Sequence, residues 1–453
     1  MVKLNSKNRE QYMNVIFDAL QYENEEQFRG VFLDLHPSDQ ADMIKQLSKE
    51  QRAIVYTYIK PEEFALTFEN FNIEDQQVFF SELDEAYTSH MFDEMFTDDV
   101  VYFLASIEDE KAEHIIDKMT DEKAEEIRVL LSYKEETAGS VMTKELVSIS
   151  SINTVGNVIE QLREEAPSAE IIYYNYVVDE DHSLVGVVSL RDLITSSPGK
   201  LIKDVMSINI LSVPVEMDQE DVANVIKKYD LLAVPVVDKH KRLLGIVTVD
   251  DIIDILEEET TEDFGEISGS KGTFDINISP LVAARKRSPW IITLMFFGLI
   301  TGSVIGSFEE TLEAIVLLAV FIPMIMDSAG NVGTQSLGVA VRGLALGTIE
   351  KGSFVKIIRR ELSTGALIGL ICMVLITALI ALFYGNPILG LIVGVSILIT
   401  LTVSAAIGAI VPLIIDKLNF DPAIASGPFI TTLNDIIGLL IYFSIATALM
   451  DVI

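Results

Sequence analysis

Asp435 is an acidic residue in the middle of an apolar stretch, 424–450, that is long enough to cross a membrane as a helix. An ionised carboxylate at membrane depth is costly unless it faces water or a cation. The predicted membrane spans contain no Lys, Arg or His to pair with it. Pro428 removes one helix hydrogen bond and frees the carbonyl of Ile424. These features predict that Asp435 meets a cation on a path across the membrane.

A second polar group interrupts another apolar stretch, 314–337. Asp327 and Asn331 occur there, followed by the hydroxyl and amide side chains of Thr334, Gln335 and Ser336. Such oxygen ligands suit Mg²⁺, which prefers octahedral oxygen coordination and gives up water reluctantly. We expect Asp327 and Asn331 to act with Asp435. The alternatives are that Asp327 lies at the membrane surface and that the glycines at 330 and 333 only pack helices.

The rest of the chain is strongly acidic. The net charge is −35, yet residues 280–453 hold nine Lys and Arg against ten Asp and Glu, so residues 1–279 carry almost all of it. Carboxylates that approach one another repel, and a bridging divalent cation then favours a compact arrangement, although solvated helix faces are the alternative. The candidate regulatory ligands are Asp93, Asp98, Glu216, Asp230, Asp251, Asp254, Glu258, Glu259, Glu262 and Asp263.

Composition excludes several classes of protein. The acidic part repels nucleic acid and anionic lipid and attracts cations. The lone Cys372 excludes an intramolecular disulfide and a cysteine zinc cluster. All five histidines precede the apolar part, which excludes intramembrane zinc proteases built on histidine ligands. Residues 1–11 lack an apolar core, so we expect no cleaved signal peptide.

Five apolar stretches predict five membrane-spanning helices, near 290–307, 314–337, 362–384, 388–415 and 424–450. Every Lys and Arg of this half precedes the first stretch or lies in the second and fourth connections. The positive-inside rule therefore predicts a multi-pass protein of the cell membrane, with its N-terminus in the cytoplasm and its C-terminus outside. Three glycine pairs predict close helix packing: Gly302/Gly306, Gly365/Gly369 and Gly390/Gly394.

The acidic half divides into a helical part and a repeat. Residues 1–133 consist of short amphipathic units separated by turns, which predicts a pile of short helices. Residues 177–194, VVDEDHSLVGVVSLRDLI, are echoed by residues 236–253, VVDKHKRLLGIVTVDDII. The segment Val141-Met142-Thr143 is likewise echoed by Val205-Met206-Ser207. Each copy predicts the order strand, helix, strand, tight turn, strand, helix.

This repeat resembles a tandem pair of CBS domains. The shared motif is Gly-x-x-Ser/Thr-x-x-Asp, which begins at Gly186 in the first copy and at Gly245 in the second. The resemblance implies an adenine nucleotide, such as ATP, at Tyr174, Arg191 and Asp192. The same Ser/Thr-x-x-Asp spacing is also a helix-capping arrangement, which leaves both interpretations open. The sequence around the pair offers no catalytic set, so the pair is expected to be a sensor.

The whole chain resembles the MgtE family of magnesium channels and transporters. The membrane signatures that carry the resemblance are Gly330-Asn331-x-Gly333-x-Gln335-Ser336 and Asp421-Pro422-Ala423 followed by Pro428 and Thr432-Leu433-x-Asp435. The fold implied is a multi-domain membrane protein: an α-helical N-domain (1–133), an α/β tandem CBS pair (138–199 and 200–260), a connecting helix (261–287) and a transmembrane domain of five helices (288–453).

The same resemblance implies a function. A homodimer would take up Mg²⁺ through a pore whose central cation site is Asp435, and cytosolic Mg²⁺ on the acidic domains would close it. The connecting helix would run from 274 to 287. The chain departs from the family pattern by Gly427-Pro428 where Asn-Pro occurs, and by Leu231 where the nucleotide site has an aromatic residue.

Four alternatives compete with this hypothesis. A related transporter could carry Co²⁺ or Mn²⁺, which oxygen ligands also accept. An anion carrier is disfavoured by Asp435 and by the lack of Lys and Arg in the predicted spans. A membrane-bound enzyme is disfavoured because no His, Cys and Asp set occurs at membrane depth. A magnesium sensor that does not transport remains a fourth hypothesis.

Overall fold

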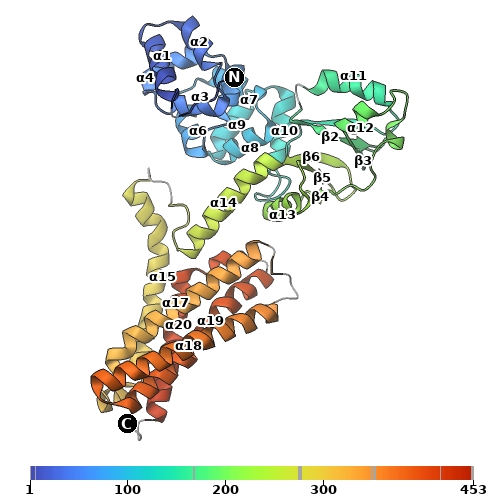
Figure 1. Ribbon diagram of the computed structural model, residues 1–453. Coiled ribbons are helices and arrows are strands. Elements are labelled where there is room, and N and C mark those ends of the chain that lie inside the picture. Colours follow the sequence, from blue (N-terminus) through green and yellow to red (C-terminus); the bar gives the residue numbers. More distant parts are fainter. Residues whose placement is uncertain are drawn as a thin grey trace. The chain divides into compact units, whose positions relative to one another are not determined.

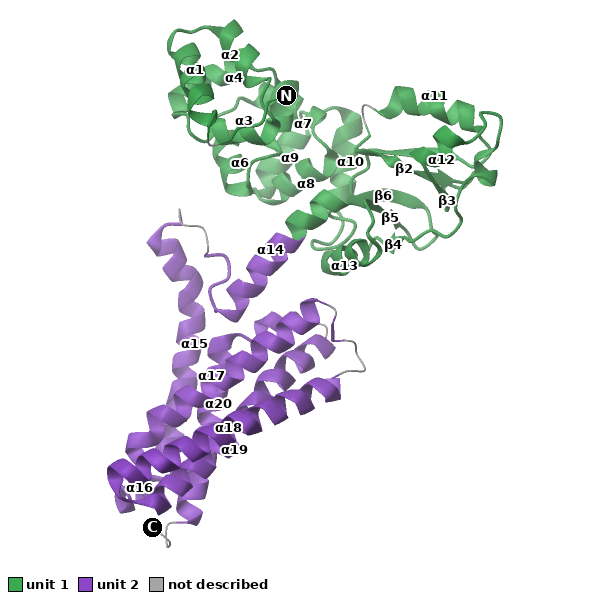
Figure 2. Ribbon diagram, viewed as in Figure 1, with its two compact units in different colours: residues 1–255 green, residues 256–453 purple. Residues whose placement is uncertain are grey.

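The computed structural model describes residues 2–5, 7–166, 169–273, 278–346, 348–349, 354–418 and 420–449. Its contacts divide the chain into two compact units, Met1–Ile255 and Leu256–Ile453 (Figure 2).

Ten short helices build the first part of unit 1 (Figure 1), as the amphipathic pattern predicted. Side chains such as Asn24, Ser48 and Asn72 cap the helix starts by accepting a hydrogen bond from a backbone N–H. Aromatic rings, including those of Phe68 and Phe103, form its core. The helices are α1 (Arg9–Gln21), α2 (Glu25–Phe32), α3 (Pro37–Ile44), α4 (Lys49–Tyr58), α5 (Pro61–Phe68), α6 (Ile73–Phe80), α7 (Glu85–Glu94), α8 (Thr97–Ala105), α9 (Asp109–Ile116) and α10 (Asp121–Leu131).

Two three-stranded sheets follow, in agreement with the predicted repeat. In each sheet the first two strands are parallel and the last two antiparallel. The first copy contains β1 (Leu146–Ser150), α11 (Val155–Glu165), β2 (Ile171–Val178), β3 (Leu184–Ser189) and α12 (Leu190–Thr195). The second contains β4 (Val213–Pro214), α13 (Gln219–Tyr229), β5 (Ala233–Val237), β6 (Leu243–Thr248) and α14 (Val249–Ile267), after the 3-10 turn η2 (Ile202–Asp204).

The repeated Val-Met-Ser/Thr segments connect the two copies. Thr143 of the first segment pairs with Ile246 of β6, and Ser207 of the second pairs with Val187 of β3. The motif glycines make room for this exchange, because a Cβ at Gly245 would lie 2.5 Å from the Thr143 carbonyl oxygen. Each copy therefore completes the other, which explains why the methionine segment and the glycine motif repeat together.

Unit 2 is helical. It contains α15 (Pro280–Gly306), α16 (Glu309–Ala314), α17 (Leu318–Ala345), α18 (Phe354–Tyr384), α19 (Pro387–Lys417), the 3-10 turn η3 (Pro422–Ile424) and α20 (Gly427–Ala448). Four of these helices, α15, α18, α19 and α20, are long and apolar enough to cross a membrane. The fifth predicted span, α17, has 28 residues but includes the polar Asp327, Asn331 and Gln335. The structure therefore has four to five apolar helices.

The expected connecting helix has different limits in the structure. α14 continues from the second CBS copy as far as Ile267. The next helix begins at Pro280 and runs without a break into the first span. Residues 274–277 of the expected helix lie outside the described residues, so the helix predicted over 274–287 corresponds here to the first turns of α15.

Glycines allow close packing in two of the three predicted places. A Cβ at Gly365 would lie 2.8 Å from the Leu401 carbonyl oxygen on α19, and one at Gly390 would lie 2.8 Å from the Thr377 carbonyl oxygen on α18. Gly302 and Gly306 instead face open space in the part of the chain that the structure describes. The tightest contact to a backbone atom is at Gly408, where a Cβ would lie 2.1 Å from the Gly333 carbonyl oxygen.

We therefore predict that Gly408→Ala destabilises the helical unit by about 2 kcal/mol, because overpacking against a backbone atom forces α17 and α19 apart. Thermal unfolding of the detergent-purified protein measures this. Gly302→Ala is the matched control and should leave the melting temperature unchanged. Equal effects of the two substitutions would contradict the packing described here.

Candidate functional site

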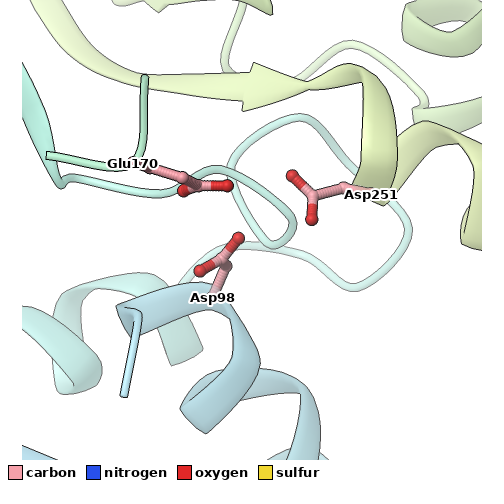
Figure 3. Close-up of side chains that lie close together, drawn as sticks. All are labelled: Asp98, Glu170 and Asp251. Atoms are coloured by element: carbon pink, nitrogen blue, oxygen red, sulfur yellow. The ribbon is translucent and has the colours of Figure 1, made fainter. Parts of the chain in front are cut away.

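Three carboxylates from distant parts of unit 1 converge on one point (Figure 3). Asp98 lies in the first turn of α8, Glu170 just before β2, and Asp251 in the first turn of α14. One oxygen of each lies within 4.8 Å of the others. Asp98 and Asp251 were both predicted from the sequence as ligands, and the structure brings these two together.

Some oxygens of these carboxylates have no hydrogen-bond partner in the described part of the chain. Asp98 is only 8% exposed. Its Oδ1 and the Oε2 of Glu170 are buried without a hydrogen-bond partner among the described residues. Burial, reinforced by repulsion from Asp251, raises the pKa of Asp98 well above its usual value and that of Glu170 to about 8. Burial raises the pKa of Asp251 to about 6, although its hydrogen bond from Thr248 opposes the shift.

Three further acids surround this group. Asp99 follows Asp98, Asp250 precedes Asp251, and Glu69 is near Asp99. Burial raises the pKa of Glu69 to about 7, and burial together with repulsion from Glu69 raises that of Asp99. Buried oxygens with unused lone pairs and a shared excess of negative charge are what a hard divalent cation requires. The acidic cluster, defined as Asp98, Glu170 and Asp251, therefore fits Mg²⁺.

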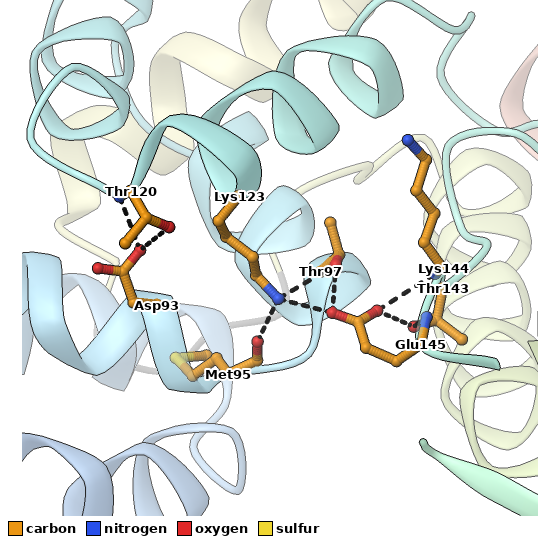
Figure 4. Close-up of polar contacts among 8 residues, drawn as sticks. All are labelled: Asp93, Met95, Thr97, Thr120, Lys123, Thr143, Lys144 and Glu145. Atoms are coloured by element: carbon orange, nitrogen blue, oxygen red, sulfur yellow. Dashed lines mark hydrogen bonds and ion pairs between the residues drawn. The ribbon is translucent and has the colours of Figure 1, made fainter. Parts of the chain in front are cut away.

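A lysine beside the acidic cluster holds the helical part to the first CBS copy (Figure 4). Lys123 of α10 donates to the Met95 carbonyl at 2.7 Å and to Glu145 at 2.6 Å, and Glu145 also accepts from Thr97. This network positions α8, and with it Asp98, relative to the strands.

Asp93, another predicted ligand, has a structural task nearby. Its Oδ1 accepts hydrogen bonds from the backbone N–H and the hydroxyl of Thr120, 3.0 and 3.1 Å away, just before α10 begins. Figure 4 shows this contact apart from the Lys123 network.

The other predicted regulatory acids are spread over the chain. Glu216 pairs with Lys239 at the surface, at 3.3 Å, and Asp230 ends α13 with a positive φ of 51°. Asp254, Glu258 and Glu259 lie along α14. The structure does not bring these residues into the acidic cluster.

A second acidic group lies at the end of α14, within unit 2. Burial and repulsion from Asp421 raise the pKa of Asp263 to about 6. Burial, together with a hydrogen bond to Asp421, raises the pKa of Glu266 to about 7. Glu262 pairs with Lys271, which also contacts Glu266 at 2.8 Å. Glu262 and Asp263 were predicted from the sequence, whereas Glu266 and Lys271 were not.

The polar residues of the membrane half lie on two helices. Asp327, Asn331 and Gln335, spaced four residues apart, form one exposed face of α17. Asp435 of α20 is half-buried, and Asp327 is near enough for the two carboxylates to repel each other. The Oδ1 of Asp435 has no hydrogen-bond partner in the described part of the chain. A hydrated cation suits this position.

Glycines of α17 allow α20 to pack closely against α17. A Cβ at Gly330 would lie 2.6 Å from Thr431, and one at Gly333 would lie 2.0 Å from the Asn434 amide. The packing interpretation of these two glycines is therefore correct. Glycine packing is also compatible with the predicted role of Asn331 as a ligand, because Asn331 lies between the two glycines in sequence but on the opposite, exposed face of α17.

A cavity in the CBS pair contains two of the three predicted nucleotide contacts. Its volume is about 550 Å³, and Tyr174 and Arg191 line it. Asp192 instead accepts a 2.6 Å hydrogen bond from Ser189 in the capping box of α12. Leu232, rather than Leu231, reaches the cavity.

Comparisons with known proteins agree with this arrangement. Residues 322–445 match the MgtE divalent cation transporter family, 35–136 the MgtE intracellular N domain, and 138–199 and 202–258 the CBS domain. The chain is 45% identical to the magnesium transporter MgtE of Enterococcus faecalis over 97% of its length and 98% of the relative's. It is 40% identical to that of Bacillus subtilis, over 93% of both chains.

Two solved structures resemble the soluble part. The soluble part of a magnesium transporter matches 55% of this chain and 99% of its own, at 40% identity and a TM-score of 0.54. The cytosolic domain of the Mg²⁺ channel MgtE in complex with ATP matches 54% and 99%, at 33% identity and a TM-score of 0.52.

Fold and site together define a multi-pass membrane protein of the divalent cation transporter class, with a CBS-containing acidic domain. The identity over nearly the full length of two curated relatives makes the family definite. The chain belongs to the MgtE family.

The acidic cluster generates a pH prediction. Because the folded pKa values of its acids are raised, the folded state binds more protons than the unfolded state between about pH 4 and pH 8. Without divalent cations, stability should therefore fall as pH rises through this window, and Mg²⁺ should restore it. Calorimetry of the soluble unit's transition at pH 5 and pH 8, with EDTA or Mg²⁺, measures both effects.

Asp98→Asn should raise stability in EDTA at pH 8 by on the order of 1–2 kcal/mol, because it removes a buried repelling acid. It should also reduce the stabilisation by Mg²⁺, because a ligand is lost. Glu110→Gln, an exposed acid of α9, is the control. A Mg²⁺ response that Asp98→Asn leaves intact would argue against a cation in this cluster.

Proposed function

We propose that this protein is a Mg²⁺ channel or transporter of the cell membrane that mediates Mg²⁺ uptake. The observation that carries the proposal is Asp435, a carboxylate on an apolar helix with a buried, unpartnered oxygen in the described structure. Asp327 of α17 lies near it, and Asn331 on the same face of α17 adds an amide oxygen. A few oxygens can hold a hydrated ion without trapping it, which conduction requires.

A homodimer completes the pore in this proposal. Asp327, Asn331 and Gln335 face outward from a single chain, although polar side chains at membrane depth need a wet or polar surface. A two-fold axis beside this face would place two copies of Asp435 about one path. Their two negative charges balance one divalent ion, so the chain alone offers half of a site.

Cytosolic Mg²⁺ closes the pore in the same proposal. The acidic cluster is repulsive without a cation, so Mg²⁺ favours the arrangement that brings its carboxylates together. Asp251 stands in the first turn of α14, and α14 ends at Ile267 against the membrane helices of unit 2. A cation at the start of α14 therefore acts on the helix that reaches the transport path.

Further parts of the proposal follow from charge. The helices cross a lipid bilayer, and the exposed basic residues flank them on one side. By the positive-inside rule, the N-terminus is therefore cytoplasmic and the C-terminus lies outside. From the transporter relatives we infer that the protein acts as a transporter rather than as an enzyme. Co²⁺ and Mn²⁺ are the alternative cargo, because oxygen ligands and a hydrated site accept them too.

Asp435→Ala should lower Mg²⁺ flux at least about tenfold, because the path loses its charge-balancing ligand at membrane depth. Asn331→Ala should lower it less, since a neutral amide orients water without balancing charge. Uptake into proteoliposomes and growth of a magnesium-auxotrophic cell measure the effect. Glu309→Gln, an exposed acid of α16, is the control. Wild-type flux in correctly inserted Asp435→Ala protein would rule out the pore assignment.

ATP is the proposed second ligand of the CBS pair. Support comes from the cavity lined by Tyr174 and Arg191 and from the related cytosolic domain crystallised with ATP. Arg191→Ala should weaken ATP binding about tenfold by removing a charge-assisted contact to phosphate. Titration calorimetry measures it, with Arg163→Ala, a surface residue paired with Glu160, as the control. Unchanged affinity in Arg191→Ala would place the nucleotide elsewhere.

A further inference from the structure

A short segment, 268–273, follows α14 and is fixed on the start of α15. Gly269 and Gly272 both have a φ of +65°, which turns the chain sharply. Lys286 donates to the Gly272 carbonyl at 2.7 Å, and Arg287 donates to the Thr273 hydroxyl at 2.9 Å. A Cβ at Gly269 would lie 2.7 Å from the ring of Trp290. This docked segment therefore has a defined place on α15.

The end of α14 contacts the entrance of α20. Ile267 packs against an apolar cluster that includes Ala423, Ala425 and Ile430. Its carbonyl oxygen would lie 3.0 Å from a Cβ at Gly427, the first residue of α20. Asp435 follows on the same helix, about 12 Å further along its axis. Docking of α14 thus occurs close to the proposed transport path.

When the end of α14 docks at the entrance of α20, acidic side chains from both segments come close together. Glu262, Asp263 and Glu266 come from the last turns of α14, and Asp421 from the loop before α20. Repulsion from Asp421 acts on both Asp263 and Glu266, and the Glu266 side chain is only 12% exposed. Arg342 offsets part of the charge at Asp263. Without a further cation, these acids would oppose the docked position.

Lys271 supplies that cation from within the docked segment. Its Nζ lies 2.8 Å from Glu266 and also pairs with Glu262. Only three residues separate Lys271 from Ile267, and both glycine turns and the contacts to α15 restrict its position. The effective concentration of the ammonium group at the acids is therefore high and independent of the Mg²⁺ concentration.

We propose that Lys271 is a built-in counter-cation that holds the end of α14 against the entrance of α20 when Mg²⁺ is absent. Mg²⁺ then completes closure that Lys271 has already favoured. This inference rests on the proposed function and specifies the regulation of the same path. The position of α14 without Mg²⁺ is then set by Lys271, a residue of the chain itself.

Trp290 is the only tryptophan of the chain and contacts the docked segment, so its fluorescence reports docking directly. Acrylamide quenching of the full-length protein in Mg²⁺-free buffer is the first measurement. Lys271→Gln should lower the docked-to-undocked ratio about fivefold, a reasonable loss for a partly buried ion pair. Quenching should therefore increase, and it should return to the wild-type value at saturating Mg²⁺.

Three variants control the experiment. Lys271→Arg keeps the charge and should behave like the wild type. Arg285→Gln removes an exposed cation of α15 that makes no ion pair with the described residues, and it should have no effect. The double variant Lys271→Gln, Glu266→Gln removes both partners and should recover part of the docking. Equal quenching of the wild type and Lys271→Gln without Mg²⁺ would overturn the proposal, as would an equal change in Arg285→Gln.

Flux measured on the same samples separates this inference from the proposed function. Increased flux of Lys271→Gln at low cytosolic Mg²⁺, together with increased quenching, supports both. Wild-type Mg²⁺ flux with unchanged quenching in Lys271→Gln overturns the role of Lys271 alone. Increased quenching in a protein that carries no Mg²⁺ supports the role of Lys271 and overturns the proposed function.

Discussion

Repulsion between carboxylates that water cannot fully solvate governs three separate places in this protein. Asp98, Glu170 and Asp251 meet in the soluble unit, Glu266 and Asp421 meet at the end of α14, and Asp435 lies near Asp327 in the membrane half. Each group is costly alone and becomes favourable with a cation. The cation that fits each group differs. A divalent ion suits the acidic cluster, Lys271 already pairs with the acids at the end of α14, and the site of Asp435 suits an ion that passes through. One physical requirement, a counter-cation for crowded carboxylates, is therefore common to all three places.

The connection between these places runs through α14. The helix has 19 residues and so is about 28 Å long. Its first turn contributes Asp251 to the acidic cluster, and its last residue, Ile267, belongs to an apolar cluster of the membrane half. α14 is therefore the chain segment that links the acidic cluster of unit 1 to the apolar cluster of unit 2. Lys123 and Glu145 make the first anchor firm, because they fix α8 to the strands on which the cluster depends.

The sequence predicted features that follow from periodicity and from charge at membrane depth. The repeat appeared in the pairing of the two CBS copies, and Asp435 was conspicuous because apolar residues surround it. Glu170 was missed because it follows other acids in a polar stretch with no spacing that marks a ligand. Its role arises only when the chain folds back onto α8. Lys271 was missed for a related reason, since a single lysine after an acidic helix resembles an ordinary surface charge until its contacts are known. The open surroundings of Gly302 in the described structure could not be predicted either, because a pair of small residues does not specify which neighbour it packs against.

Small residues decide how the polar face of α17, formed by Asp327, Asn331 and Gln335, is presented. Gly333 lies between α19 and α20: its carbonyl oxygen touches Gly408, and its missing side chain leaves space for the Asn434 amide. α17 therefore packs closely on both neighbours with one face and keeps Asp327, Asn331 and Gln335 free on the other. A bulkier residue at 333 would displace α20 and move Asp435 away from Asp327 without touching either carboxylate. Close backbone packing is thus the condition under which Asp327 of α17 and Asp435 of α20 lie near each other, and it explains why glycine and polar residues alternate in the same short segment of α17.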